Sequence, residues 1–210
     1  MSVTESKNIG ESKQLLADEV FHHIGQQIID GVLPPQHRIR DVDVAEEFHV
    51  SRTPVREALQ RLERLGLVMM YPSRYTEVTT VTGEIVDQTR VFAGYQAGIS
   101  ARMGVPRITA TQRTHLAKLV DDMHIALEAD EGTTESRWAV FSYLSDHSGN
   151  TQHVSLMNDA EVALFRNLRD WRVPQADQER MHTTYASFRA AILRGDADEA
   201  ERLSRAMYYV

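Results

Sequence analysis

From Thr82 almost to Val210 the chain repeats one pattern, in which apolar residues recur at helical spacing and only short breaks interrupt them. This segment can therefore bury its apolar residues only by packing helix against helix. Two apolar stripes show the spacing clearly: Leu116, Val120, Met123 and Leu127, and Met157, Ala160, Leu164, Leu168 and Trp171. The breaks predict helices over 83–103, 109–129, 134–148, 152–171, 176–194 and 196–209. We expect an all-helical bundle of about six helices in residues 81–210.

The first 80 residues follow a different pattern. Residues 1–13 are polar and show no periodicity, which predicts a disordered tail. Apolar residues then recur at helical spacing over 16–28, and Gly31 is placed to end that helix in a left-handed conformation. A second, short helix is expected over about 42–48, with Asp41 as its N-cap.

A third helix and a hairpin follow. Thr53 is expected to cap the helix and Pro54 to occupy its first position, where a missing N–H is harmless. Residues 67–80 contain two short β-favouring runs around Pro72-Ser73-Arg74, which predicts a β-hairpin. Three helices and a hairpin are the elements of a winged helix-turn-helix, which we assign to residues 14–80. The chain is thus mainly α, with a domain boundary near residue 80.

Composition excludes several classes of function. The 210 residues include no cysteine, which removes disulfide frameworks, thiolate zinc sites and cysteine nucleophiles. No apolar run approaches the roughly 20 residues that a bilayer requires, and we expect a cytoplasmic protein without membrane contact. The net charge is −7, from 23 Lys+Arg against 30 Asp+Glu. A nucleic-acid partner would therefore have to bind a local cluster of basic residues.

The third predicted helix carries such a cluster. Between Val50 and Arg64 there are four arginines and two glutamates. The helix has an apolar face at Val55, Leu59 and Leu62 and an opposite polar face at Arg52, Thr53, Arg56 and Gln60. Arginines at a helix N-terminus can bind phosphate oxygens or the edge of guanine in the major groove. An ordinary solvated helix face would carry the same residues, so the pattern alone leaves both interpretations open.

A family resemblance favours DNA. The segment VSRTPVREALQRLERLGLV, preceded by GVLPPQHRIRDVDVAEEF, closely resembles the DNA-binding module of the GntR family of bacterial transcriptional regulators, over about residues 15–78. The resemblance implies a ligand-responsive repressor that acts as a homodimer on a palindromic operator, since one recognition helix contacts few base pairs. It implies DNA contacts by Ser51, Arg52, Thr53 and Arg56, a position near the backbone for Arg40, and a place in the wing for Arg74.

Two positions depart from the family pattern. Gln36 and Tyr75 stand where family members usually have glycine, and a lost positive-φ residue would alter the wing. The alternative is therefore a helical small-molecule-binding protein with a vestigial DNA-binding module.

The second half more loosely resembles the FCD domain of FadR-type members, and its six helices place it nearer the VanR-like subgroup. The resemblance rests on Arg90, on Ser148-Gly149-Asn150 and on AAILRGDADEAERL. Many FCD domains hold a divalent metal with one aspartate and three histidines. In this register those positions are Arg137, Phe141, Tyr185 and Met207. None of the four is a plausible ligand, so we expect no metal and no cofactor.

The replaced positions allow two interpretations. Arg137 could bind the carboxylate or phosphate of a small anionic effector, in a pocket lined by Phe141, Tyr185 and Met207, with Arg90 as a second anion contact. Alternatively, the three neighbours fill the cavity as ordinary core, Arg137 reaches out to solvent and Arg90 forms an ion pair.

Nothing in the sequence indicates catalysis. It contains no nucleophile elbow, no phosphate-binding glycine loop and no H-E-x-x-H helix. A metal hydrolase built on Asp146, His147 and His153 is the remaining enzyme alternative. Adjacent helical residues point about 100° apart, however, and a Gly-Asn break precedes His153. We therefore do not expect an enzyme.

Overall fold

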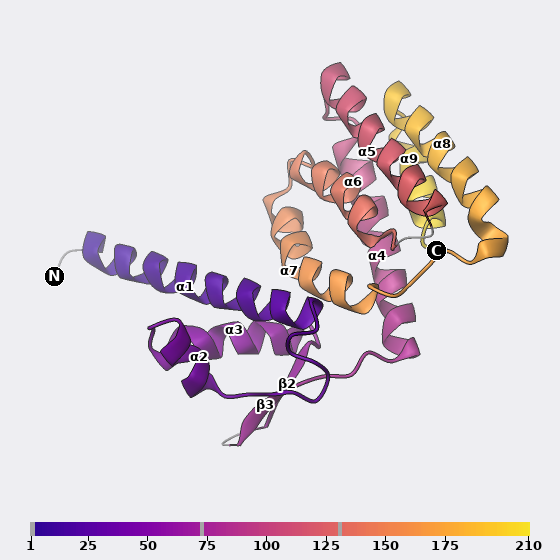
Figure 1. The fold of residues 1–210 in the computed structure, drawn as a ribbon. Coiled ribbons are helices and arrows are strands. Elements are labelled where there is room, and N and C mark those ends of the chain that lie inside the picture. The colour runs from indigo at the N-terminus through magenta and orange to yellow at the C-terminus, as the bar shows by residue number, and fades with distance from the viewer. Residues whose placement is uncertain (1–2, 72–73, 130–131) are drawn as a thin grey trace. The chain divides into compact units, whose positions relative to one another are not determined.

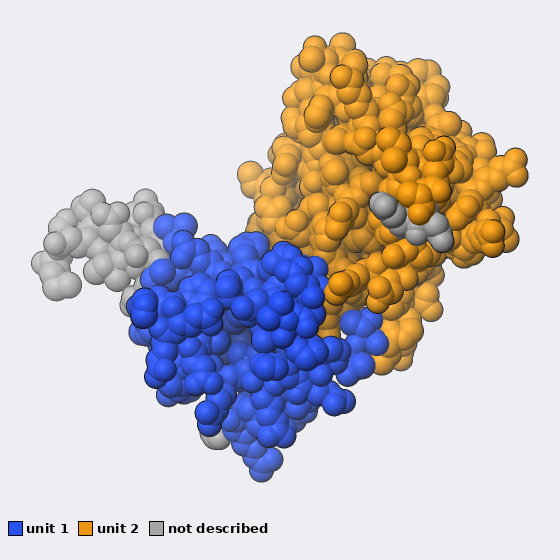
Figure 2. Space-filling view, viewed as in Figure 1, with its two compact units in different colours: residues 1–81 blue, residues 82–210 orange. Residues whose placement is uncertain are grey.

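The computed structural model describes residues 3–71, 74–129 and 132–210, with side chains from Leu15 onward. The chain divides into two compact units, residues 1–81 (unit 1) and residues 82–210 (unit 2), as Figure 2 shows. The division lies beside the boundary expected near residue 80. None of the described helices is long and apolar enough to cross a bilayer.

Unit 1 is a winged helix-turn-helix, as the sequence predicts. Three helices pack beside a small antiparallel sheet with strand order β1-β3-β2. Strands β2 and β3 form the expected hairpin, with Val68 opposite Val78 and Tyr71 opposite Tyr75. The elements are α1 (Val3–Ile29), β1 (Arg38–Ile39), α2 (Asp41–Glu47), α3 (Arg52–Arg64), β2 (Val68–Tyr71) and β3 (Tyr75–Val78) (Figure 1).

Helix α1 corrects one expectation, because it begins at Val3 where the sequence predicts a disordered tail over residues 1–13. The segment contains no proline and several good helix formers. Extending an existing helix adds one hydrogen bond for each residue that is fixed, so a polar extension can continue a helix whose later turns are packed.

The helix starts in the helix-turn-helix also differ from expectation. Ser51, with an extended backbone, is the N-cap of α3 in place of Thr53, and Pro54 occupies the third helical position. Arg40 is the N-cap of α2, and Asp41 is its first residue. All N–H groups of the first turn lack an intrahelical acceptor, so proline is tolerated there as well as at the first position.

The core of unit 1 lies between α1 and α3. Val55, Leu59 and Leu62 of α3 are at most 1% exposed, which confirms the predicted apolar face. Arg61 forms an ion pair with Asp18 of α1. These contacts fix α3 from behind and leave its opposite face exposed.

Unit 2 is the expected all-helical bundle. Its core includes the two predicted stripes, of which only Trp171 is partly exposed. The fourth helix ends earlier than expected, and a short 3-10 turn precedes the fifth. The elements are α4 (Gly83–Gly104), α5 (Ala110–Glu128), α6 (Thr134–Asp146), α7 (Thr151–Asn167), η1 (Gln175–Asp177), α8 (Gln178–Arg194) and α9 (Ala197–Ala206).

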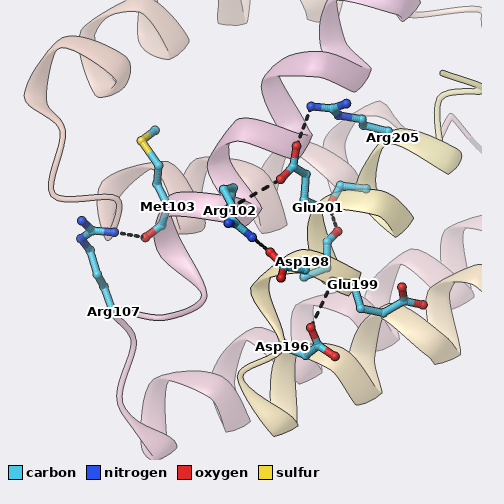
Figure 3. A network of polar contacts seen from close by, with 10 residues as sticks. Arg102, Met103, Arg107, Asp196, Asp198, Glu199, Glu201 and Arg205 are labelled. Carbon is cyan, nitrogen blue, oxygen red and sulfur yellow. Dashed lines mark hydrogen bonds and ion pairs between the residues drawn. The ribbon is translucent and has the colours of Figure 1, made fainter.

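Helices α4 and α9, the first and last of unit 2, pack closely against each other (Figure 3). A Cβ atom at Gly98 of α4 would come within 2.9 Å of Arg205 Nε, so a larger residue there would require the Arg205 side chain to shift. Ion pairs join the helices at the contact: Arg102 of α4 pairs with Asp198 and Glu201 of α9, and Glu201 also binds Arg205.

Candidate functional site

A groove of about 840 Å³ lies between α2, α3 and the hairpin of unit 1. All seven predicted DNA contacts are exposed. Five of them line the groove: Arg40, Arg52, Arg56, Gln60 and Arg74. The other two, Ser51 and Thr53, lie at the exposed N-terminal end of α3. The fold therefore brings the predicted residues to one side of unit 1.

Asp41 joins two of the four arginines that line the groove, Arg52 and Arg56. Its carboxylate accepts hydrogen bonds from Arg52 Nη2 at 2.7 and 2.9 Å and from Arg52 Nε at 3.2 Å. The same carboxylate accepts a hydrogen bond from Arg56 Nε at 2.8 Å. Sequence reasoning treated Asp41 as a helix cap and missed this role, because a pairing across 11 and 15 positions leaves no periodic signal.

The pair of arginines also determines the charge of Asp41. Partial burial raises the pKa of this carboxyl. The hydrogen bonds and charges of Arg52 and Arg56 together lower it by more, so the net pKa lies below its ordinary value. Asp41 is therefore ionised at neutral pH and offsets one of the two positive charges.

Arg61 and Arg64 lie outside the groove lining. Arg61 pairs with Asp18 and its guanidinium lies 4.1 Å from the ring of Phe21, on the core side of α3. Arg64 is exposed near the C-terminal end of the helix. Two of the four arginines counted between Val50 and Arg64 are therefore absent from the groove lining.

The two departures from the family pattern have different outcomes. Gln36 has a φ of 69°, so it adopts the left-handed conformation that glycine would take more easily. Tyr75 lies in β3, its ring centroid is 4.8 Å from that of Tyr71 in a tilted arrangement, and the Arg38 guanidinium lies 4.2 Å from the Tyr75 ring. The hairpin is thus formed without a glycine at this position. Pro72 and Ser73 of the predicted turn lie outside the described residues.

The four family metal positions cluster in the core of unit 2. Phe141 is 2% exposed and Tyr185 and Met207 are fully buried. Arg137 is 1% exposed, so the expectation that it might reach solvent is wrong. The side chain points into the bundle, and its guanidinium lies among aromatic rings there.

Arg137 is held by aromatic and polar neighbours. Its Nη2 and Nε donate to Tyr185 Oη at 2.8 and 3.1 Å. Its guanidinium lies 4.8 Å from the ring of Tyr208 and 5.0 Å from the ring of Trp171. Burial raises the pKa of Tyr208 to about 12, so that hydroxyl stays neutral beside the cation. The third nitrogen, Nη1, is buried and has no hydrogen-bond partner among the described residues.

The cavity beside this cluster is small. It has a volume of about 20 Å³ and is lined by residues that include Phe141, Trp138 and Tyr208. That is room for about one water molecule. Arg90 donates to the carbonyl of Tyr208 and pairs with Asp87 at 3.6 Å. Phe141, Tyr185 and Met207 are therefore buried core side chains, and Arg90 forms an ion pair.

The residues at the family metal positions do not fit a metal ion. Arg137 is a cation that directs N–H donors into the site, and phenylalanine offers no donor atom. Across the part of the chain that the structure describes, no three histidine or carboxylate side chains are grouped to hold an ion. Asp146 is exposed, whereas His153 is buried and bonded to Ser100 at 2.9 Å, so the hydrolase cluster is not assembled.

Two histidines that looked unrelated in the sequence meet in unit 2. His124 of α5 and His182 of α8 have Nδ1 atoms 2.8 Å apart, and their rings stack at 5.1 Å. Burial lowers the pKa of His124, and the neighbouring His182 lowers it further. One ring must be neutral to accept the hydrogen bond.

Comparisons with known proteins agree with both halves of the fold. Residues 16–78 match the family described as bacterial regulatory proteins, gntR family, and residues 98–209 match the FCD domain. The chain is 29% identical over 115 residues to an HTH-type transcriptional regulator of the TAR-I ttuE-ttuC' intergenic region of Agrobacterium vitis, covering 53% of this chain and 67% of that protein. It is 31% identical over 70 residues to the HTH-type transcriptional regulator YdhC of Bacillus subtilis strain 168, covering 33% of this chain and 31% of that protein.

The chain therefore spans about a third of the Bacillus protein and two thirds of the Agrobacterium protein. Among solved structures, Escherichia coli McbR/YncC has the same fold, with a TM-score of 0.67 and 19% identity over 92% of this chain and 93% of that one. The FCD match alone spans more than half of the sequence. With its winged helix-turn-helix followed by an FCD domain, the chain belongs to the GntR family of bacterial regulatory proteins.

Proposed function

We propose that this protein is a ligand-responsive transcriptional repressor that binds a palindromic operator as a homodimer, and that it acts by binding and not by catalysis. The observation that carries the proposal is the exposed N-terminal end of α3, with Arg52 and Arg56 in a groove between α2 and the hairpin. An exposed helix end with two arginines has the size and donor pattern that a major groove accepts.

The wing supports DNA binding over a vestigial module. The hairpin is complete at Tyr71 and Tyr75, and Arg74 lies exposed at its turn, where it could contact the backbone or the minor groove. Gln36 adopts the left-handed conformation that favours glycine, in spite of its side chain. The two sequence departures therefore leave the elements of the interface in place.

An exposed apolar face on α4 supports the homodimer. Four large apolar residues at helical spacing are 36–47% exposed there: Val91, Phe92, Tyr95 and Ile99. Contiguous exposed apolar residues are typical of protein interfaces, and a second copy of the chain is the partner that a twofold operator requires. We assign this face to the dimer contact.

Arg137 supports an anionic effector. A buried guanidinium with an unpartnered Nη1 is a strong site for a carboxylate or phosphate oxygen. The neighbouring cavity holds about one water molecule, so an effector can enter only if side chains such as Phe141 and Tyr208 move. That movement is the step through which a ligand would change the conformation of unit 2.

The test of DNA binding begins with the wild-type protein, which is used to select duplexes from a randomised library. Arg52→Ala and Arg56→Ala should each weaken binding to the selected duplex by about 1–3 kcal/mol. Arg64→Ala is the matched control, because it removes the same charge from the same helix outside the groove. The wild-type affinity should fall with salt, with a log–log slope of about −0.9 for each phosphate neutralised. Failure to bind any duplex, or equal effects of all three variants, would contradict the proposal.

The test of the dimer is the mass of the protein in solution. Phe92→Glu or Ile99→Glu should shift the protein from dimer to monomer, as measured by sedimentation equilibrium. Ile125→Glu, which introduces the same charge at a residue of α5 that is 63% exposed, should leave the mass unchanged. A monomeric wild-type protein would refute the dimer.

A further inference from the structure

Asp41 is the carboxylate that binds both arginines of α3 in the groove, Arg52 and Arg56. Its side chain is 21% exposed, whereas those of Arg52 and Arg56 are 52% and 57% exposed. The acid therefore lies beneath the arginines, at the start of α2, and the guanidinium groups lie above it.

The hydrogen bonds occupy only part of each guanidinium. Asp41 accepts from Nε and Nη2 of Arg52 and from Nε of Arg56. No other described residue accepts a hydrogen bond from Arg52 Nη1 or from the two terminal nitrogens of Arg56. These nitrogens remain as donors for DNA, and the two terminal nitrogens of Arg56 have the spacing for a paired contact with the O6 and N7 atoms of guanine.

The carboxylate has two effects on such contacts. It fixes two long, flexible side chains before DNA arrives, so less conformational entropy is lost when they bind a base. It also places a negative charge close to any phosphate that approaches the groove. Complexes that depend on phosphate contacts alone lose more from this repulsion than complexes that also make base contacts.

We propose that Asp41 is a positioning residue that sets DNA specificity: it holds Arg52 and Arg56 for base contact and weakens binding to non-operator DNA. The inference rests on the proposed DNA-binding function and adds to it a residue that does not itself contact a base. The low pKa of Asp41 is consistent with a permanently charged acid at this position.

The experiment compares Asp41→Asn with Asp43→Asn. Asp43 is exposed on the same helix and lines the same groove, so the two variants change the net charge equally. Binding is measured by fluorescence anisotropy over a range of salt concentrations, on a duplex selected by the wild-type protein and on a scrambled duplex of the same composition. The specificity ratio is the affinity for the first duplex divided by the affinity for the second.

For Asp41→Asn the specificity ratio should fall at least about fivefold, the lower limit for one paired arginine–guanine contact. Its salt slope on scrambled DNA should steepen by about 0.9 per subunit, as a freed arginine neutralises one more phosphate. Asp43→Asn should raise both affinities by the same factor and leave the ratio unchanged. Asp41→Glu should restore most of the ratio, which a general loss of folding would not allow.

The outcomes separate the two proposals. Equal ratios for Asp41→Asn and Asp43→Asn, with a selective wild-type protein, would overturn the role of Asp41 and leave the regulator proposal intact. A wild-type protein that binds all duplexes equally, or none, would overturn both. The Nε–H signals of Arg52 and Arg56 in NMR spectra give a DNA-free check, since both should shift in Asp41→Asn and neither in Asp43→Asn.

Discussion

Tyr185→Phe should destabilise unit 2 far more than the loss of one hydroxyl group ordinarily does. Tyr185 Oη accepts hydrogen bonds from Nε and Nη2 of the buried Arg137 guanidinium. With that oxygen removed, the guanidinium would keep the Met181 sulfur at 3.6 Å, its contact with the Tyr208 side chain and the ring of Trp171. A buried charge without compensating hydrogen bonds is costly.

The magnitude follows from the bonds lost. Each hydrogen bond to a charged group contributes about 1.5–3 kcal/mol, and the two bonds share one oxygen, so we expect a loss of about 3 kcal/mol. Arg137→Met removes the charge itself, and replacement of a buried ion by an apolar side chain is often neutral or stabilising. In that background Tyr185→Phe should cost at most about 1 kcal/mol. The coupling energy between the two residues is then about 2 kcal/mol.

Urea unfolding followed by tryptophan fluorescence measures this cycle. Both tryptophans, Trp138 and Trp171, belong to unit 2, so the signal reports on that unit. Thr183→Val is the control, because it removes a hydroxyl from an exposed residue of α8 and should change the free energy of unfolding by less than about 0.5 kcal/mol. A coupling energy below about 0.5 kcal/mol would refute the account of Arg137 as a charge held by Tyr185.

Three further predictions concern pH, metal ions and the turn before β1. Burial lowers the folded pKa of His124 and His153 below the unfolded value of about 6.5, so the unfolded chain binds more protons as the pH falls. The free energy of unfolding should be constant above about pH 6.5 and should fall as the pH is lowered further, by up to about 1.4 kcal/mol per pH unit for each histidine. A flat profile from pH 7.5 to 5.5 in urea titrations would show that these pKa shifts are absent. Thermal stability measured by calorimetry should not respond to EDTA or to added zinc, manganese or nickel, and stoichiometric metal in the purified protein would contradict this. Gln36→Gly should raise the free energy of unfolding of unit 1 by up to about 1 kcal/mol. It removes the cost of about 1–2 kcal/mol for a left-handed non-glycine residue, and the greater backbone entropy that glycine loses on folding offsets part of that gain. Circular dichroism melts that show no gain would argue against strain at this turn.

The sequence predicts those parts of the fold that depend on local patterns. The apolar stripe of α3 and the hairpin have a periodicity of their own, and Gly31 and Gly195 adopt positive φ values where helices were expected to end. Strand β1 is only two residues long and exists because it pairs with β3, about 40 positions later, so no local signal marks it. The exact helix starts depend on backbone conformation at single residues, which a propensity does not resolve.

The candidate site divides in the same way. The sequence could predict that one face of α3 is exposed, because exposure follows from the helical period of a single element. That face carries Arg52, Arg56 and Gln60. The pairing of Asp41 with Arg52, and of Arg137 with Tyr185, could not be predicted, because each pair joins two elements whose relative placement is a tertiary result. The family resemblance pointed to Arg137 through its place in the sequence. Its burial, however, depends on the aromatic side chains of other helices that surround it.

The packing of α4 against α9 has a consequence for the order in which the chain folds during synthesis. Unit 1 makes its contacts within the first 81 residues, so it can fold as soon as they leave the ribosome. In unit 2, α4 emerges first, and the carbonyl that Arg90 binds belongs to Tyr208, 118 positions later. At about 5–20 residues per second, translation takes about 6–24 s to cover that distance. During this interval the face of α4 that α9 covers is bare, and nascent unit 2 is open to chaperones while unit 1 is already folded.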